Sequence, residues 1–179
     1  DQLVAGERFA ELQTGLNQIN ARGFSNLRIS GGGGRDFAQL RDSIANDQFT
    51  FGPGAALANI NGSEIQLGEF EQIRATVTQG YDSAWFNDSS GNDQFFQTPQ
   101  GAGMFNNWYD NQISGADLLN ARSSQGEDTA QLTDTSANDT AWMHQRQTVI
   151  SSDLLRTVVE GFKRVNLVAN QGGQDTVNL

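Results

Sequence analysis

The chain has 179 residues, a formal net charge of −10 and a pI near 4.3. Such an acidic surface repels phosphate groups, so we expect no nucleic-acid partner. The chain has no cysteine, which excludes disulfides and thiolate metal sites, and no apolar stretch reaches the roughly 18 residues of a membrane span, so we expect no membrane insertion. Abundant Gly, Asn, Asp, Gln, Ser and Thr favour turns and strands.

The N-terminal stretch from Phe9 to Ile19 can be interpreted in two ways. Its apolar residues are spaced by three or four, which is the pattern of an amphipathic helix. The equivalent stretches further along the chain contain Gly62 and β-branched residues, which favour strands. Both interpretations remain open at this point.

A period of 46 residues runs through the whole chain. One column of positions 46 residues apart holds only glycine, and the column two residues later holds aspartate, with the last copy displaced by one residue: Gly34, Gly80, Gly126 and Gly172; Asp36, Asp82, Asp128 and Asp175. A fixed period of this length is typical of repeat architectures. We expect each column glycine to form a turn with positive φ or a close backbone approach.

Three strands can be predicted in each repeat from apolar residues that alternate with polar ones. Alternation with period two is typical of a strand with one buried face. The columns are Leu27, Ile73, Leu119 and Val165 for the first strand, Ala38, Ala84 and Ala130 for the second, and Leu3, Phe49, Phe95 and Ala141 for the third. We expect a fourth strand in the variable stretches, residues 60–67, 104–113 and 149–159.

No single repeat can bury its apolar face, but stacked repeats can form continuous apolar ladders. The sequence therefore predicts an all-β fold, a parallel β-solenoid built from four tandem repeats of 46 residues, with equivalent side chains stacked one strand spacing apart. We expect a single repeat domain over 1–179. Its units are a partial repeat 1–23, repeats 24–69, 70–115 and 116–161, and a partial repeat 162–179.

The turns between the predicted strands are rich in carboxylates. They share the motif G-x-D-x-A-x-(L/F)-x-D-(S/T)-x-x-N-D. Calcium takes six to eight oxygen ligands and suits such turns, but Asp and Asn also bond to backbone in turns without any ion. Both explanations are kept, and calcium is the one cofactor considered. The candidate calcium ligands are Asp36, Asp42, Asp47, Asp82, Asp88, Asp93, Asp128, Asp134 and Asp139.

The pattern D-S-x-x-N-D-x-F, as in Asp88 to Phe95, resembles the tandem β-strand repeats of very large secreted bacterial surface proteins of planctomycete type. More loosely, G-x-D and G-N-D-x-F resemble the haemolysin-type calcium-binding repeats called RTX, although the RTX period of nine residues is absent. The first resemblance covers nearly the whole chain. It implies a structural role in an extracellular or cell-surface location.

We expect no enzyme activity. His144 is the single histidine, and the carboxylates lie mostly in repeating columns rather than in one unique constellation. A polysaccharide-active β-helix enzyme remains an alternative. Trp85 alternates with Ala84 and Phe86, which predicts an outward side chain and a candidate contact for a surface glycan.

The ends of the chain predict self-association. Asp1 aligns with Asp47 and Leu179 aligns with Phe86, so another copy could continue the solenoid in register. Open solenoid ends are unpaired strand edges, and head-to-tail contacts that do not close make filaments. We therefore expect a subunit or segment of an extracellular fibre, surface layer or adhesin, with a calcium-dependent adhesive or ligand-binding module as the alternative. A fragment of a longer array would show the same edges.

Overall fold

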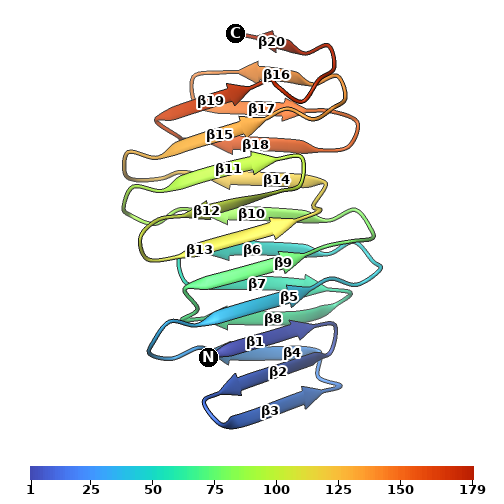
Figure 1. Cartoon of the computed structure of the whole chain (residues 1–179), viewed down its shortest axis with the longest axis vertical. Helices are drawn as coiled ribbons and strands as arrows, with labels where there is room; N and C mark the ends of the chain where they lie inside the picture. The colour runs from blue at the N-terminus through green and yellow to red at the C-terminus, as the bar shows by residue number, and fades with distance from the viewer.

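A computed structural model describes all of residues 1–179 as an all-β protein with no helix. Twenty strands form two ten-stranded sheets, which lie one behind the other as two layers (Figure 1). Sheet A has the order β19-β15-β11-β12-β13-β9-β5-β1-β2-β3, and sheet B has the order β20-β16-β17-β18-β14-β10-β6-β7-β8-β4. The predicted β-solenoid is confirmed. Because there is no helix, none could span a membrane.

The strands follow the repeat frame. Residues 1–23 contain β1 (Gln2–Gly6), β2 (Phe9–Thr14) and β3 (Asn17–Arg22). Residues 24–69 contain β4 (Asn26–Ser30), β5 (Phe37–Arg41), β6 (Gln48–Gly52), β7 (Ala55–Ile60) and β8 (Ser63–Gly68). Residues 70–115 contain β9 (Gln72–Thr76), β10 (Ser83–Asn87), β11 (Gln94–Thr98), β12 (Gly101–Phe105) and β13 (Asp110–Ser114). The remaining strands are β14 (Leu118–Arg122), β15 (Thr129–Thr133), β16 (Thr140–Met143), β17 (Gln147–Ser151), β18 (Arg156–Glu160), β19 (Arg164–Val168) and β20 (Thr176–Asn178).

Each complete repeat has five strands rather than the predicted four. The variable stretch contributes two strands, and these form an antiparallel meander with the third predicted strand, as in β6-β7-β8. The N-terminal stretch that admitted a helix is the meander β1-β2-β3. Here Leu16 and Ile19 are exposed, so their three-residue spacing reflects a turn and an outer strand and not a buried helix face.

Because of this meander, the prediction that residues 46 apart stack on each other is wrong. Within one repeat the chain crosses between the sheets three times, for example from β4 to β5, from β5 to β6 and from β8 to β9. Since three is odd, the next repeat starts on the other sheet. Residues 46 apart therefore lie on opposite sheets, and Ala38 pairs with Ile73 rather than with Ala84.

The coils stack in parallel with a different spacing. Residues that pair between neighbouring coils are 35 residues apart, as Ala38 and Ile73 are, or 38 residues apart, as Ile73 and Asn111 are. Parallel pairing runs through β1-β5-β9-β13 in sheet A and through β6-β10-β14-β18 in sheet B. The antiparallel meanders are inserted between these runs, first in one sheet and then in the other.

The predicted apolar columns line the space between the sheets. A cluster of 31 buried residues forms the core, and Leu3, Ala38, Phe49 and Ala84 are fully buried in it. Aromatic rings follow one another through this core. Phe51 contacts Phe86 with ring centroids 4.9 Å apart, and Phe86 contacts Phe95 at 5.5 Å. Phe95 belongs to sheet A and the other two to sheet B, so the rings join the two layers.

The glycine column behaves as predicted. All four members have positive φ, between 97° for Gly126 and 130° for Gly34. A Cβ on Gly126 would lie 2.0 Å from the carbonyl oxygen of Gly91 on the neighbouring coil, so only glycine allows this approach. At the C-terminal end Gly173 makes the corresponding contact in place of Gly172, which agrees with the one-residue displacement of Asp175.

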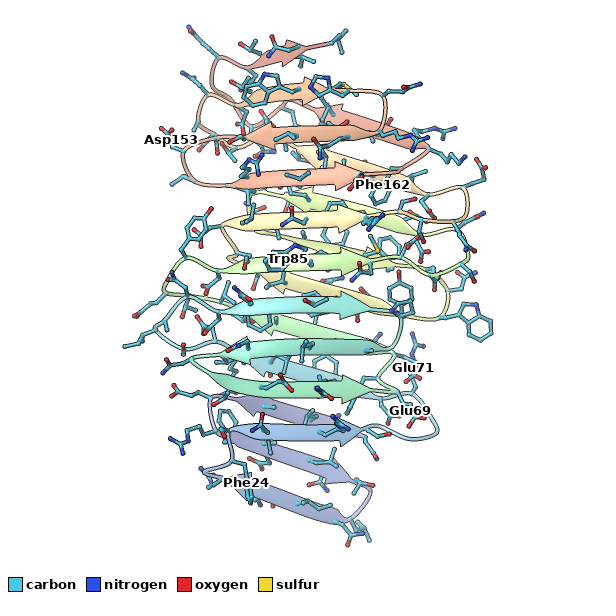
Figure 2. All side chains as sticks on the ribbon, turned by 180° about the vertical axis from the view of Figure 1, so that it is seen from behind. Phe24, Glu69, Glu71, Trp85, Asp153 and Phe162 are labelled. Atoms are coloured by element: carbon cyan, nitrogen blue, oxygen red, sulfur yellow. The ribbon has the colours of Figure 1, made fainter.

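Two equivalent phenylalanines differ in burial and provide a test of the core. Phe70 is fully buried, whereas 58 % of Phe24 is exposed at the N-terminal end of the solenoid (Figure 2). We expect Phe70→Ala to reduce the free energy of unfolding by about 3–5 kcal/mol, because it leaves a cavity. Phe24→Ala should change it by less than about 1 kcal/mol. Urea unfolding of the two variants measures this difference, and equal losses would contradict the assigned core.

Candidate functional site: the acidic turns

The second aspartate of the motif joins one coil to the next. Asp88 accepts hydrogen bonds from the backbone N–H of Ser124 at 2.6 Å and of Gln125 at 3.1 Å. Asp42 contacts Thr78 and Gln79 in the same way, and Asp134 contacts Asn170 and Gln171. The acceptor and its donors lie 36 or 37 residues apart, so each bond spans neighbouring coils.

The third aspartate closes its own turn. Asp93 accepts from the backbone N–H of Ser89 at 3.0 Å and from the Ser89 hydroxyl at 2.7 Å. Asp47 is bound by Ser43 and Asp139 by Thr135 with the same geometry. The asparagine before it reaches the next coil, since Asn92 accepts from the backbone N–H of Glu127 at 2.9 Å. Every polar position of D-(S/T)-x-x-N-D thus has a hydrogen-bonding role within the fold.

The first and third aspartates form short ladders along the edges of the solenoid. The backbone N–H of Asp47 donates to Oδ1 of Asp82 at 2.7 Å, and the backbone N–H of Asp82 donates to Oδ2 of Asp117 at 2.8 Å. The same contact links other successive coils. The pairs are Asp1 with Asp36, Asp36 with Glu71, Asp93 with Asp128, and Asp139 with Asp175. Glu71 lies at a turn on one edge of the solenoid (Figure 2).

The inserted meanders limit the length of these ladders. Glu71 precedes β9, and β9 pairs with β13 on the next coil. The backbone N–H of Asp110, the first residue of β13, donates to the Glu71 carbonyl, so the residue that follows Glu71 in the ladder is Tyr109. After Asp117 the corresponding residue is Leu155, because Arg156 donates to the Asp117 carbonyl. Like charges one coil apart repel each other. An uncharged residue follows each three-membered acidic ladder and ends the row of charges.

A position outside the motif decides how well each ladder carboxylate is satisfied. Five residues before Asp128 lies Ser123, whose hydroxyl donates to Oδ2 of Asp128 at 2.6 Å. The equivalent residue before Asp82 is Val77, and the equivalent before Asp36 is Gly31, and neither has a donor side chain. Oδ2 of Asp36 is buried without a partner, and the carboxylate of Asp82 accepts a single hydrogen bond although the residue is only 1 % exposed.

Burial raises the pKa of Asp82 from 3.8 to about 6, and repulsion from Asp47, Asp42 and Asp117 adds to the rise. The bond from the Asp47 amide opposes it. Since the folded protein binds this proton more tightly than the unfolded chain does, the ionised Asp82 carboxylate reduces stability above about pH 6. That loss is relieved as the pH falls from about 6 to 3.8.

Val77→Ser should supply the missing donor. The new hydroxyl should bond to the free oxygen of Asp82, in the position from which the Ser123 hydroxyl bonds to Asp128, and should lower the pKa of Asp82 toward 3.8. The pKa is measured by carbon-13 NMR titration of the carboxyl group. The matched control is Val77→Ala, which removes the same methyl groups without adding a donor. Equal pKa values of Asp82 in the two variants would contradict the role of this position.

The nine candidate calcium ligands are distributed over these contacts rather than gathered. No group of three or more Asp, Glu or His side chains is placed to hold a metal ion. The oxygens of Asp42, Asp47, Asp88 and Asp93 already accept two or more hydrogen bonds from the chain. The turn interpretation accounts for these carboxylates through hydrogen bonds within the chain.

A comparison of thermal unfolding in calcium and in EDTA tests this interpretation. We expect melting temperatures that agree within about 2 °C, which corresponds to less than about 1 kcal/mol for a chain of this size. Calcium bound at a hundred times its dissociation constant would stabilise the fold by about 2.7 kcal/mol. A rise of about 5 °C or more in calcium would therefore favour metal sites in the turns.

The sequence identified the motif residues but not their partners. It found the three Asp columns and the Asn column, and it placed Trp85 outward, where its side chain is 37 % exposed on sheet B beside buried Ala84 and Phe86. It missed Val77 and Ser123, because their column holds four different residues. It also missed Tyr109, whose hydroxyl donates to Asp93 at 2.8 Å and whose pKa is raised by burial.

Comparisons of this chain with protein-family models, with curated proteins and with solved structures returned no match.

Proposed function

We propose that the chain is a structural protein, a subunit or segment of an extracellular fibre, surface layer or adhesin, joined head to tail to the next unit through the open ends of its solenoid. The proposed role involves no catalysis. The observation that carries it is that the strand edges exposed at the two ends are of complementary kinds. In this proposal the next unit is a second copy of the chain.

The ends expose four strand edges. Sheet A ends at β3 and β19, and sheet B ends at β4 and β20. The inward-facing residues of these edge strands are exposed, whereas residues at the same repeat positions inside the solenoid are covered by a neighbouring coil. Val177 is 53 % exposed and Ile19 is 56 % exposed, whereas the column partners Ala84 and Ile65 are fully buried. Unpaired edges with uncovered apolar residues are templates for further strand addition.

The strand pairs inside the solenoid indicate which exposed strand at one end can pair with which exposed strand at the other end. The first strand of a repeat pairs in parallel with the fifth strand of a neighbouring coil, as β9 does with β13 and β14 with β18. The second strand pairs with a first strand, as β5 does with β9 and β10 with β14. The exposed β19 is a first strand and β3 is a fifth strand. The exposed β20 is a second strand and β4 is a first strand.

The complementary edges also lie in matching sheets, since β19 and β3 belong to sheet A while β20 and β4 belong to sheet B. Continuing the internal register places Val165 opposite Ile19 and Val177 opposite Leu27 of the next unit. Both pairs are apolar, so stacking would extend the buried ladders. The contact joins two different surfaces and does not close on itself, so repeated addition makes a filament.

Electron microscopy of the purified chain tests this proposal. We expect unbranched filaments one solenoid wide, in calcium and in EDTA alike, because the contacts are apolar and backbone contacts. Ile19→Asp and Val177→Asp should each abolish them, since each places a charge in the buried junction while altering an exposed residue of the single chain.

The matched control is Leu57→Asp, which alters an exposed apolar residue on the outer wall of sheet B, away from both ends. This variant should still form filaments. Isolated short rods from the unaltered chain would contradict the proposal. Filaments that persist in both end variants would also contradict it, because they would have to form through another surface.

A further inference from the structure

We propose that the outer face of sheet A carries a binding groove for an uncharged oligosaccharide, built by residues of the repeat 70–115 together with residues of β15 and β19. Two hollows with volumes of about 400 Å³ and about 610 Å³ lie next to each other there and share Gln94 and Phe105 in their linings. The first is bounded by the exposed Trp108 at the turn between β12 and β13. The second reaches Arg164 and Asn166 on β19.

The groove departs from the repeat pattern. Phe96 occupies the position that Val4, Thr50 and Trp142 hold in the other repeats, and Phe105 the position of Gln13, Asn59 and Ser151. Structural positions of a solenoid recur in every repeat, as the acidic turns do. A cluster that occurs in one repeat only is therefore not needed for stacking.

The fold holds the aromatic residues in place. The Phe96 ring lies against Gly103, where a Cβ would come within 2.6 Å of the ring, so glycine makes room for it. The Phe96 and Phe105 ring centroids are 6.2 Å apart. Both rings are half-buried on the outer face of the sheet, and each keeps a surface toward the solvent.

Trp108 is also held by a rigid turn although its side chain is 83 % exposed. Its backbone N–H donates to Oδ1 of Asn106 at 2.7 Å, and Nδ2 of Asn106 donates to Asp93 at 2.8 Å. Its neighbour Tyr109 is buried and donates to the same carboxylate at 2.8 Å. These three hydrogen bonds fix the backbone of the turn, so presenting the exposed indole to a ligand requires little ordering of the backbone.

The chemistry of the lining selects the ligand class. Aromatic rings can stack against the C–H faces of sugar rings, and side-chain amides can both donate to and accept from hydroxyl groups. The amides come from Asn92, Gln94, Gln112, Gln131 and Asn166. Neither lining includes a carboxylate, although the chain has 21 acidic residues. Arg164 is the single charged side chain, so an uncharged, hydroxyl-rich ligand fits best.

The extent of the groove favours a chain of sugars over a single one. It crosses the five adjacent strands β13, β12, β11, β15 and β19. At about 4.8 Å between strands, this is about 19 Å along the solenoid axis. The groove lies on a lateral face, and its far end reaches β19, the edge strand at which the next unit would join in the proposed filament.

Isothermal titration calorimetry and tryptophan fluorescence with a panel of hexasaccharides test the proposal. The panel contains β-linked glucose, xylose, mannose and N-acetylglucosamine, with hexagalacturonate as the charged comparison. We expect at least one uncharged hexasaccharide to bind and to change the fluorescence. Phe96→Thr, which introduces the residue found at the equivalent Thr50, and Trp108→Ala should each weaken binding about tenfold or more.

The matched control is Trp142→Ala, which removes an exposed Trp from sheet B on the opposite face and should leave the affinity unchanged. Circular dichroism melts check that all variants are folded. Absence of binding by every uncharged hexasaccharide would overturn the proposal. Binding of hexagalacturonate alone would overturn it too, as would binding that Phe96→Thr and Trp108→Ala leave intact.

Discussion

The three-stranded antiparallel meander in each repeat is the constraint on which the rest of the structure depends. It occupies three adjacent places in one sheet, so a 46-residue repeat crosses between the sheets an odd number of times. Successive meanders therefore lie in alternate sheets. A strand pairs in parallel with a strand 35 or 38 residues away, so the contacts along the solenoid axis connect unlike positions of the repeat.

This offset gives the acidic turns their physical meaning. Equivalent aspartates do not stack on each other, as the period suggests, but on a different column of the same motif. The first and second aspartates of the motif then receive backbone N–H groups from the adjacent coil, which offsets the desolvation of a buried charge. The meanders end the three-membered ladders, and Lys163 follows the pair of Asp93 and Asp128. Burial raises the pKa of the Asp82 carboxyl group to about 6, and Val77 offers no hydroxyl in the position from which Ser123 donates to Asp128.

The same arrangement separates the regular parts of the molecule from the irregular ones. Columns that recur in every repeat build the core and the turns, and they also determine which strand types are exposed at the ends. The residues Phe96, Gly103, Phe105 and Trp108 have no such recurrence and gather on one outer face. Assembly and ligand binding would thus use different surfaces of one solenoid, the first its ends and the second its wall.

The sequence alone determined the repeat, the strand-forming columns, the buried faces of those strands and the glycine turns, because each depends on a local two-residue alternation or on one backbone conformation. It expected one strand in the variable stretch, where β8 lies, but it could not place the additional strand Ala55–Ile60, since this stretch varies between repeats. Only the tertiary structure decided that repeats alternate between sheets, that Asp47 meets Asp82 and that Val77 leaves Asp82 without a second donor. Those contacts depend on the number of sheet crossings in the chain path, and a periodic sequence carries no local signal for that number.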